Sequence, residues 1–445
     1  MTSTTTQQVS PQTLRKVIVA AGIGNFVEWF DFAVYGFLAT TIAQQFFPSG
    51  DASAALLKTF AVFAVAFAFR PLGGIFFGML GDKIGRKRTL AATILLMAAA
   101  TTLIGLLPTY ATIGVAAPIL LSLIRCAQGF SAGGEYAGAC AYLMEHAPND
   151  KRAWYGSFIP VSTFAAFASA AVLAYALEAS LSADAMASWG WRLPFLVAAP
   201  LGLVGLYLRW KLDETPAFQA VTQEKDVAHS PLKETLRNHG AAMCCLGAFV
   251  SLTALSFYMF TTYFTTYLQV AGGLSRATAL LVSLIALMFA AAICPLAGLY
   301  SDRVGRRKTV MSACALLIVV VYPAFLMASS GSFAASVIGV MLLATGAVLC
   351  NVVTAALLSE TFPTRTRYTA SAVTYNMAYT LFGGTAPLMA TWLISSTGSN
   401  LSPAFYLMLV ALLGLAGGLA LRETSRVSLH EVGVEEKEVG VEVVA

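Results

Sequence analysis

Hydrophobic residues in this chain form long unbroken runs rather than short alternating ones. Runs of about 20 residues are long enough for a helix to cross the ~30 Å hydrocarbon core of a bilayer. Short polar stretches separate the runs, which cover residues 16–46, 55–80, 90–108, 113–143, 154–178, 190–210, 241–269, 278–300, 309–328, 333–360, 368–396 and 403–422. The pattern predicts an all-α polytopic membrane protein with twelve transmembrane helices.

Two polar segments divide this pattern into larger units. Residues 211–240 are charged, contain proline and are too polar to insert, so we expect them to connect two groups of six spans. Residues 424–445 are acidic and poor in aromatic residues, which is typical of a disordered tail. We therefore expect an N-terminal six-helix half over 1–210, a cytoplasmic connector over 211–240, a C-terminal six-helix half over 241–423 and the tail over 424–445.

Basic residues between the spans predict how the chain is oriented. Lys and Arg gather after spans two, four, eight and ten, whereas the loops 47–53, 109–112, 179–189, 329–332 and 397–402 contain neither. An excess of Lys and Arg marks the cytoplasmic loops of membrane proteins. Both termini and the connector are therefore expected in the cytoplasm, and the protein in the cell membrane.

Composition excludes several other classes. Hydrophobic residues make up 58% of the chain and charged residues 11%, and the mean hydropathy is +0.74, whereas soluble domains are about 25% charged. The net charge of +5 resides in the loops, so it indicates topology and not a nucleic-acid partner. The first fourteen residues are polar, and we expect no cleavable signal peptide.

Catalytic and cofactor motifs are missing from the sequence. The seven cysteines are scattered without a C-x-x-C, so neither a disulfide framework nor a zinc site is indicated. The four histidines, 146, 229, 239 and 430, fall in loops or the tail. G-x-x-x-x-G-K-[ST] is absent, which excludes the usual nucleotide loop. We expect no enzyme, no metal and no cofactor.

Two motifs occur once in each half. The stretch "GMLGDKIGRKRT" (78–89) aligns without gaps with "GLYSDRVGRRKT" (298–309). An E-x-x-P-x-x-x-R spacing ends at Arg152 in the first half and at Arg367 in the second. Two matches in register indicate that the halves are internal repeats.

These motifs, the twelve spans and the long connector resemble the major facilitator superfamily. A finer similarity, to the metabolite:proton symporter family, lies in "GNFVEWFDFAVYGF" (24–37), "RPLGGIFFGMLGD" (70–82), "RCAQGFSAGGEY" (125–136) and "WGWRLPF" (189–195). Members of that family carry proline and betaine, α-ketoglutarate, citrate or shikimate. The first half is most similar to the proline and betaine carriers, whereas "SFYMFTTYFTTYL" (256–268) is more similar to the α-ketoglutarate carriers.

The repeated loop motif is a candidate cytoplasmic gate. Its aspartates are placed to face the positive N-terminus of a neighbouring helix. The resemblance implies that Asp82 and Arg86 hold the two halves together in one conformation and release them in the other. Topogenic charge is the alternative, and Arg152 and Arg367 could pair with Glu145, Glu360 or the motif aspartates. The candidate gate residues are Gly78, Asp82, Gly85, Arg86, Arg152, Asp302, Arg306 and Arg367.

Charged residues also occur inside the spans of the first half. An ionised group at mid-bilayer costs at least ~2.5–3.5 kcal/mol, so such groups usually face the bundle interior and mark an ion or substrate path. We expect proton coupling at Glu28, Asp31 and Glu135, without deciding which titrates, and binding of a substrate carboxylate at Arg125, Arg70 and Gln128. The alternative is a structural ion pair, for example between Arg70 and Asp31.

The second half offers hydroxyls, amides and aromatic rings instead. Tyr258, Thr262, Thr265 and Gln269 are spaced to form one continuous helical stripe. Such groups suit a small polar solute, and aromatic faces could hold a quaternary ammonium; interhelical hydrogen bonds are the alternative. The candidate substrate-binding residues here are Tyr258, Thr262, Thr265, Asn351, Tyr375 and Asn376. Trp189 and Trp191 are expected at the membrane interface.

The sequence as a whole predicts a secondary active transporter. We expect proton-coupled uptake, by alternating access, of a small carboxylate-bearing metabolite, either a proline- or betaine-type zwitterion or an organic anion such as α-ketoglutarate. Its partners would be the solute, protons and the lipid bilayer, with the monomer as the working unit. A proton-coupled exporter of the same superfamily and a non-transporting membrane sensor are the alternatives.

Overall fold

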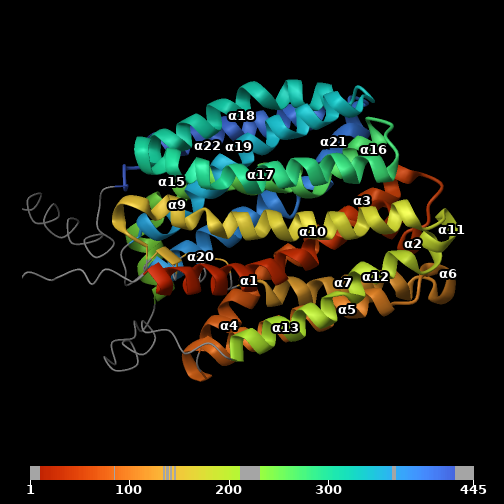
Figure 1. Ribbon diagram of the computed structural model, residues 1–445, viewed down its shortest axis with the longest axis horizontal. Helices are drawn as coiled ribbons and strands as arrows, with labels where there is room; N and C mark the ends of the chain where they lie inside the picture. The colour runs from red at the N-terminus through yellow and green to blue at the C-terminus, as the bar shows by residue number, and fades with distance from the viewer. Residues whose placement is uncertain are drawn as a thin grey trace, which may run out of the picture.

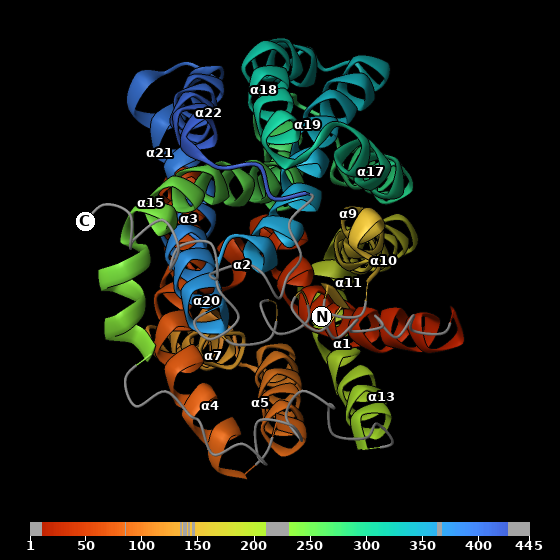
Figure 2. The same ribbon diagram turned by 90° about the vertical axis from the view of Figure 1, so that its left-hand side faces the viewer.

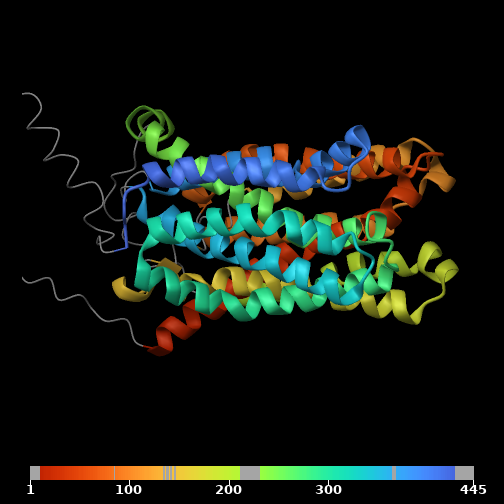
Figure 3. The same cartoon turned by 90° about the horizontal axis from the view of Figure 1, so that it is seen from above.

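The computed structural model describes residues 11–84, 86–133, 147–210, 231–362 and 367–425, together with positions 136, 140, 143 and 144. Helices account for almost all of this described part, which contains no strand. They lie side by side along the long axis of the molecule (Figures 1 and 3). Eight described helical stretches are long and apolar enough to cross a membrane, and a bent pair adds a ninth.

The helices of the first half are α1 (Pro11–Phe37), α2 (Ala39–Phe46), α3 (Ala52–Ala68), α4 (Arg70–Ile84), α5 (Arg86–Leu106), α6 (Tyr110–Ile113), α7 (Ala116–Ser131), η1 (Asn149–Lys151), α9 (Arg152–Gly156), α10 (Phe158–Ser180), α11 (Ala183–Ser188), η2 (Gly190–Arg192), α12 (Leu193–Leu196) and α13 (Ala198–Trp210). Those of the second half are α15 (Pro231–Tyr258), η3 (Met259–Tyr263), α16 (Phe264–Val270), α17 (Arg276–Val304), α18 (Arg306–Ala328), α19 (Phe333–Glu360), α20 (Arg367–Ala378), η4 (Tyr379–Gly383), α21 (Ala386–Thr397) and α22 (Ser402–Ala420).

Each of the twelve predicted spans contains at least one of these helices, but several spans are interrupted. The first bends by 63° between α1 and α2. The second breaks between α3 and α4, where Pro71 has no N–H to donate to the carbonyl of Phe67 four residues earlier. That carbonyl instead accepts a hydrogen bond from the hydroxyl of Thr380, in the second half, at 2.9 Å. The break therefore also joins the halves.

The end of the predicted connector is helical in the structure. Helix α15 begins at Pro231, and the apolar span that it opens runs from His239 to Val270, so the predicted start of the seventh span at 241 agrees within two residues. Proline is well suited to the first turn of a helix because its missing N–H is not needed there. Residues 211–230 lie outside the described part.

The two groups of helices form two sides of one bundle. Viewed end-on, α18, α19 and α22 lie on one side and α4, α5 and α13 on the other (Figure 2). The halves meet where α10 packs along α17 and α3 packs against α21. We call the end with the α4–α5 and α17–α18 junctions the basic end, and the end with α2, α6 and α11 the opposite end (Figure 1).

Glycines bring three backbones of the first half into contact. A Cβ atom at Gly73 would overlap the carbonyl of Phe130, and one at Gly129 would overlap the carbonyl of Ala66. Small residues of this kind let membrane helices pack at backbone distance. Helices α3, α4 and α7 are thereby held against one another. This contact sets the backbone positions of Arg70 on α4 and Arg125 on α7.

Candidate functional site

A chain of buried polar groups crosses the centre of the first half. Nη1 of Arg125 donates to Oε1 of Gln128 at 2.7 Å, and Nε2 of Gln128 donates to the hydroxyl of Thr101 at 2.6 Å. Thr101 is in turn hydrogen-bonded to the carboxylate of Asp31. All four side chains are buried. The network couples a cation on α7 to a carboxylate on α1 through neutral groups.

A second cation lies beside this network. Nη2 of Arg70, the first residue of α4, is 3.5 Å from Oε1 of Glu28 on α1, and both side chains are buried. The ion-pair partner of Arg70 is therefore Glu28 and not Asp31, the residue given above as an example of a structural partner.

Aromatic rings surround both guanidinium groups. The Cζ atom of Arg125 is 4.2 Å from the ring centroid of Tyr35, 5.2 Å from Phe63 and 5.4 Å from Phe32. That of Arg70 is 4.7 Å from Phe67, 4.9 Å from Phe32 and 5.7 Å from Trp29. These distances are within the range of cation–π attraction. We call Trp29, Phe32, Tyr35, Phe63, Phe67, Arg70, Arg125 and Tyr258 the arginine–aromatic cluster.

Arg125 is only partly satisfied in this cluster. Its Nε and Nη2 atoms are buried and have no hydrogen-bond partner among the described residues. These two donors form one edge of the planar guanidinium, and such an edge matches the two oxygens of a carboxylate. A buried polar group without a partner is costly, so this edge marks a place where a ligand carboxylate fits.

The second half contributes Tyr258 to the same cluster. Its ring lies 5.1 Å from Phe67, 5.7 Å from Phe63 and 6.2 Å from Trp29, all first-half residues, and its hydroxyl has no partner in the described part. The last residue of α15 thus inserts between α1 and α3. Both halves meet at the cluster, where a rocking motion would rearrange it.

The predicted stripe on the seventh span is interrupted at Thr265, and the reason is local. Residues 259–263 form a π-helical turn, which contains more residues per turn than an α-helix and shifts the positions that follow. Thr262 still faces the first half, where a Cβ at Gly36 would lie 2.7 Å from its methyl group. Thr265 instead hydrogen-bonds Ser283 of α17, in its own half, at 2.7 Å.

The remaining candidates of the second half bind protein groups. The amide of Asn351 donates to the carbonyl of Ala347 in its own helix at 2.9 Å. The amide of Asn376 donates to the carbonyl of Gly133 in the first half, also at 2.9 Å. The ring of Tyr375 stacks on Tyr136 of the first half at 4.6 Å. Asn376 and Tyr375 therefore join the halves between the cluster and the basic end.

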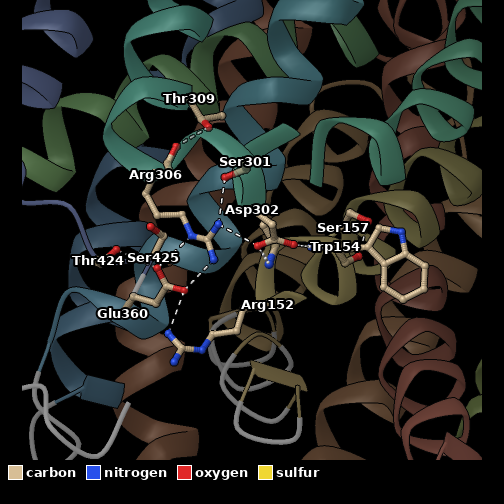
Figure 4. A network of polar contacts seen from close by, with 12 residues as sticks. Arg152, Trp154, Ser157, Ser301, Asp302, Arg306, Thr309, Glu360, Thr424 and Ser425 are labelled. Atoms are coloured by element: carbon tan, nitrogen blue, oxygen red, sulfur yellow. Dashed lines mark hydrogen bonds and ion pairs between the residues drawn. The ribbon is translucent and has the colours of Figure 1, made fainter. Parts of the chain in front are cut away.

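Ion pairs join the halves at the basic end (Figure 4). Glu360, at the end of α19, accepts from Arg306 of α18 at 3.0 Å and from Arg152 of α9 at 3.2 Å. All three side chains are buried. Arg152 belongs to the first half and the other two to the second. The motif residues thus form a buried connection between the halves.

Asp302 makes a second connection at this end. Its carboxylate accepts from the backbone N–H of Ala153 at 3.0 Å and of Trp154 at 2.8 Å, at the start of α9, and from Arg306 at 2.9 Å (Figure 4). Gly298 makes this approach feasible, because a Cβ there would be 2.7 Å from the carbonyl of Ala153. An acid at a helix N-terminus is stabilised by the unpaired N–H groups.

The segment after α22 binds to the same region. The carboxylate of Glu423 accepts from the backbone N–H of Arg306 at 2.8 Å and of Arg307 at 3.1 Å. Burial works to raise the pKa of Glu423, but these hydrogen bonds outweigh it and lower the pKa below its ordinary value. The hydroxyl of Thr424 donates to Glu360 at 2.8 Å. The first residues of the predicted tail are thus in place, and 426–445 lie outside the described part.

Several predicted site residues fall outside what the structure describes. Glu135, Glu145 and Gly85 are not described, and neither are the surroundings of Gly78 or the side chains of Asp82, Arg86 and Arg367. The known gate contacts consequently come from the second-half copy of the motif and from Arg152. Among the described residues, no group of three His, Cys, Asp or Glu side chains could hold a metal ion.

Sequence reasoning missed the contacts at the opposite end. Nη1 of Arg276, the first residue of α17, donates to the hydroxyl of Thr41 at 3.0 Å and lies 3.8 Å from the carboxylate of Glu178 on α10. The hydroxyl of Thr40 lies 3.4 Å from Oε1 of Gln269. The signal was available, since Arg276 is a lone basic residue between spans seven and eight. With both ends joined, the structure is a closed form.

One aromatic expectation is wrong. Trp191 is fully buried and its ring packs against Phe46 at 5.7 Å, whereas Trp189 is about half exposed. The 3-10 turn η2 directs Trp191 into the first half, while Nη1 of the adjacent Arg192 donates to the carbonyls of Gly105 and Leu107 at 2.9 and 2.6 Å. Trp191 is thus a core residue at the end of the bundle and not an interface anchor.

Comparison with known proteins places these features in context. The family model described as Major Facilitator Superfamily matches residues 21–387 and 287–443. A proline/betaine transporter of Salmonella typhimurium is 40% identical over 422 residues, covering 93% of this chain and 84% of the relative. An ectoine/proline transporter of Corynebacterium glutamicum is 37% identical over 452 residues, with coverage of 98% and 90%.

Solved structures show the same fold at lower sequence identity. The proton:xylose symporter XylE, bound to a sugar analogue, superposes with a TM-score of 0.72 at 18% identity, over 96% of this chain and all of that one. An inward-open structure of the xylose transporter from E. coli gives a TM-score of 0.70 at 17% identity, with coverage of 95% and 99%. At this identity the likeness concerns the arrangement of helices only.

Proposed function

The chain belongs to the major facilitator superfamily and is a multi-span membrane transporter, not an enzyme, and we propose that it takes up a small zwitterion together with protons. The zwitterion is of the proline or betaine type, with a carboxylate and a nitrogen cation in one compact molecule. The relatives named above support this class and give no support to α-ketoglutarate.

The observation that carries the proposal is the open edge of Arg125. Its Nε and Nη2 donors are buried without a partner in the described part, at the point where the two halves meet. A monocarboxylate that binds there satisfies both donors at once. Gln128 holds the remaining Nη1 donor at 2.7 Å and so fixes the plane of the guanidinium before the solute arrives.

The rings of the cluster suit the cationic end of the same solute. Trp29, Phe67 and Tyr258 present aromatic edges and faces next to Arg70. A substituted ammonium can bind such faces without a protein carboxylate as partner. The site therefore avoids the cost of burying a further charged side chain. A dicarboxylate needs a second free cation instead, and Arg70 is already paired with Glu28 at 3.5 Å. The cluster therefore favours a zwitterion over an organic dianion.

Proton coupling is assigned to the carboxylates of α1. Glu28 and Asp31 are buried beside the two arginines, and taking up one proton neutralises a negative charge that the solute would otherwise meet. Alternating access then requires the contacts at the basic end and at the opposite end to break in turn. The orientation predicted from the loops puts the basic end in the cytoplasm.

Uptake into proteoliposomes tests this function. Labelled glycine betaine, proline and α-ketoglutarate are supplied separately, with and without an inward proton gradient. The proposal expects betaine or proline to accumulate only with the gradient. Uptake of α-ketoglutarate alone would contradict the zwitterion assignment. Extrusion of the solute driven by proton entry would identify an exporter. Saturable binding without flux would identify a sensor.

A further inference from the structure

A small cavity lies beside Glu28, inside the first half and away from the contact between the halves. It has about 10 Å³ of room for the centre of a water molecule. A cavity needs roughly 10–15 Å³ on this measure to hold one water. Its walls come from α1, α5 and the end of α7, namely Val27, Glu28, Thr93, Ile94, Met97, Ser131 and Ala132.

Three of the lining residues carry polar side chains. They are Glu28, Thr93 and Ser131, one from each wall. The hydroxyl of Ser131 donates its proton to the carbonyl of Thr93 at 2.6 Å, so its oxygen remains an acceptor. A buried water typically makes two to four hydrogen bonds. The cavity therefore has both the size and the polar groups for one water in contact with a carboxylate.

The position of the cavity relates it to the basic end. Thr93 lies seven residues after Arg86, where α5 begins, which at ~1.5 Å per residue is about 10 Å from that end. Thr101, which belongs to the Arg125 network, lies two turns further in. The cavity thus stands between the arginine–aromatic cluster and the basic end. None of its lining residues belongs to the ion pairs that join the halves at that end.

We propose that this cavity holds a water molecule through which Glu28 releases its proton toward the basic end. The inference rests on the proposed proton symport. A proton on the carboxyl of Glu28 passes to the water, the water gives up a proton to solvent at the basic end, and the carboxylate remains. The charged or titratable groups that face Glu28 from other described elements include Arg70, at 3.5 Å, and Tyr258.

Pairing with Arg70 completes the step. Once Glu28 is ionised, the guanidinium of Arg70 compensates its charge, as seen in the closed structure. When Glu28 is protonated, Arg70 loses the charge of that partner. The route within the first half lets protons leave while Glu360, Arg152 and Arg306 still hold the basic end shut.

Removing the hydroxyls of the cavity tests the proposal. In the double variant Thr93→Val, Ser131→Ala, Glu28 is the only polar lining side chain, which is too few partners for a water. Two rates are measured in proteoliposomes: betaine-driven proton influx with a trapped pH-sensitive dye, and betaine counterflow at equal pH. We expect proton influx to fall about 10-fold or more, while counterflow stays close to that of the wild type.

Matched variants separate a water site from a structural role. Thr93→Ser keeps a hydroxyl in the cavity and should restore proton influx in the Ser131→Ala background. Thr102→Val removes a hydroxyl that bonds the carbonyl of Ala98 on the same helix, and should leave both rates unchanged. Unchanged proton influx in the double variant overturns the proposal. Equal loss of influx and counterflow overturns it too, since it indicates damage to the solute site or the fold.

The proposed function fails in a different way. If the wild type itself shows no betaine-driven proton influx, the proposed proton symport is wrong, whether or not the cavity holds a water. If the wild type couples and only the water step is wrong, the wild type and the double variant give the same proton influx.

Discussion

Arg125 is an expensive residue to keep at the centre of a membrane protein. It is buried, three aromatic rings surround it, and two of its donors have no partner in the described part of the chain. A charge buried in a low-dielectric interior costs several kcal/mol unless hydrogen bonds and a counter-charge compensate it. A bound carboxylate supplies both, so the cost is removed when the solute is present.

The variant Arg125→Lys tests this reading because it keeps the charge and removes the planar edge. A lysine offers a point charge and cannot bind a carboxylate through two parallel donors. Hydrogen bonds to charged groups contribute about 1.5–3 kcal/mol, so we expect the KM for betaine counterflow to rise about 10- to 100-fold. Arg303→Lys, at an exposed position, is the control. An unchanged KM for Arg125→Lys would exclude bidentate binding.

Tyr258 tests the cationic end of the solute. Its ring lies within the cluster while its hydroxyl has no partner among the described residues. Tyr258→Phe keeps the aromatic face and should leave the KM for betaine unchanged. Tyr258→Leu removes the face, and since cation–π attraction is worth about 0.5–2 kcal/mol, we expect a KM about 2- to 30-fold higher. Equal KM values for the two variants would show that Tyr258 only fills space.

At the residue scale, the sequence locates the charged positions but not their partners. Glu28, Asp31, Arg70 and Arg125 stand out because a charge within an apolar run must face the interior. The pairing of Arg70 with Glu28, and the hydrogen bond from Thr380 to the freed carbonyl of Phe67 in the other half, appear only in the structure. Single-sequence patterns do not contain a contact over 313 residues.

At the scale of the helix, periodicity is reliable only while the helix stays α-helical. The π-helical turns η3 and η4 lie in the seventh and eleventh spans, and both face the first half. Such a turn changes the angular spacing of the residues within and after it, and Thr262 and Thr265 accordingly contact different neighbours. The bend at Leu38 has the same effect on α1 and α2.

Gly298 sets how closely α17 can approach α9, and this distance can be tested. In Gly298→Ala the new methyl group would be 2.7 Å from the carbonyl of Ala153 and 2.8 Å from the Cα of Trp154. Neither backbone atom can move aside without shifting α9. We expect the basic end to open more often, so that a cysteine at the buried Thr374 reacts faster with an impermeant maleimide added from that side.

The measurement for Gly298→Ala uses Thr374→Cys in a background without the seven native cysteines. Gly240→Ala is the matched control, because α15 has open space around Gly240 and its backbone needs no glycine. Equal labelling rates in the two variants would mean that α17 and α9 do not separate during transport.

At the scale of the molecule, the repeated motifs made it possible to predict the fold from the sequence. Two motifs at matching places in both halves, together with the lengths of the apolar runs, predict two six-helix groups, and the family match and the end-on arrangement agree with this (Figure 2). The opposite end carries no such repeat. In the sequence its contacts among Arg276, Thr41 and Glu178 are therefore marked only by Arg276, a lone basic residue between spans seven and eight.

The two ends of the molecule are closed by interactions of different strength. At the basic end, Glu360 binds two buried arginines, and Asp302 binds the start of α9. At the opposite end, Arg276 and Glu178 are partly exposed and 3.8 Å apart. Partly exposed pairs contribute about 0–1 kcal/mol, whereas breaking a buried pair costs about 3–5 kcal/mol. The closed form should therefore open more readily at the opposite end, which is the external side if the basic end is cytoplasmic.

Glu360→Gln and Glu178→Gln make this asymmetry measurable. The first leaves Arg152 and Arg306 without their shared carboxylate, so the basic end should open in most molecules, whereas the second should change the population at the opposite end at most about five-fold. Spin labels at the exposed positions 151 and 303 report the basic end, and labels at 183 and 330 the opposite end, by pulsed electron–electron distance measurement. If Glu178→Gln shifts its distances as far as Glu360→Gln does, the ends are equally strong. The resting protein would then have no preferred side.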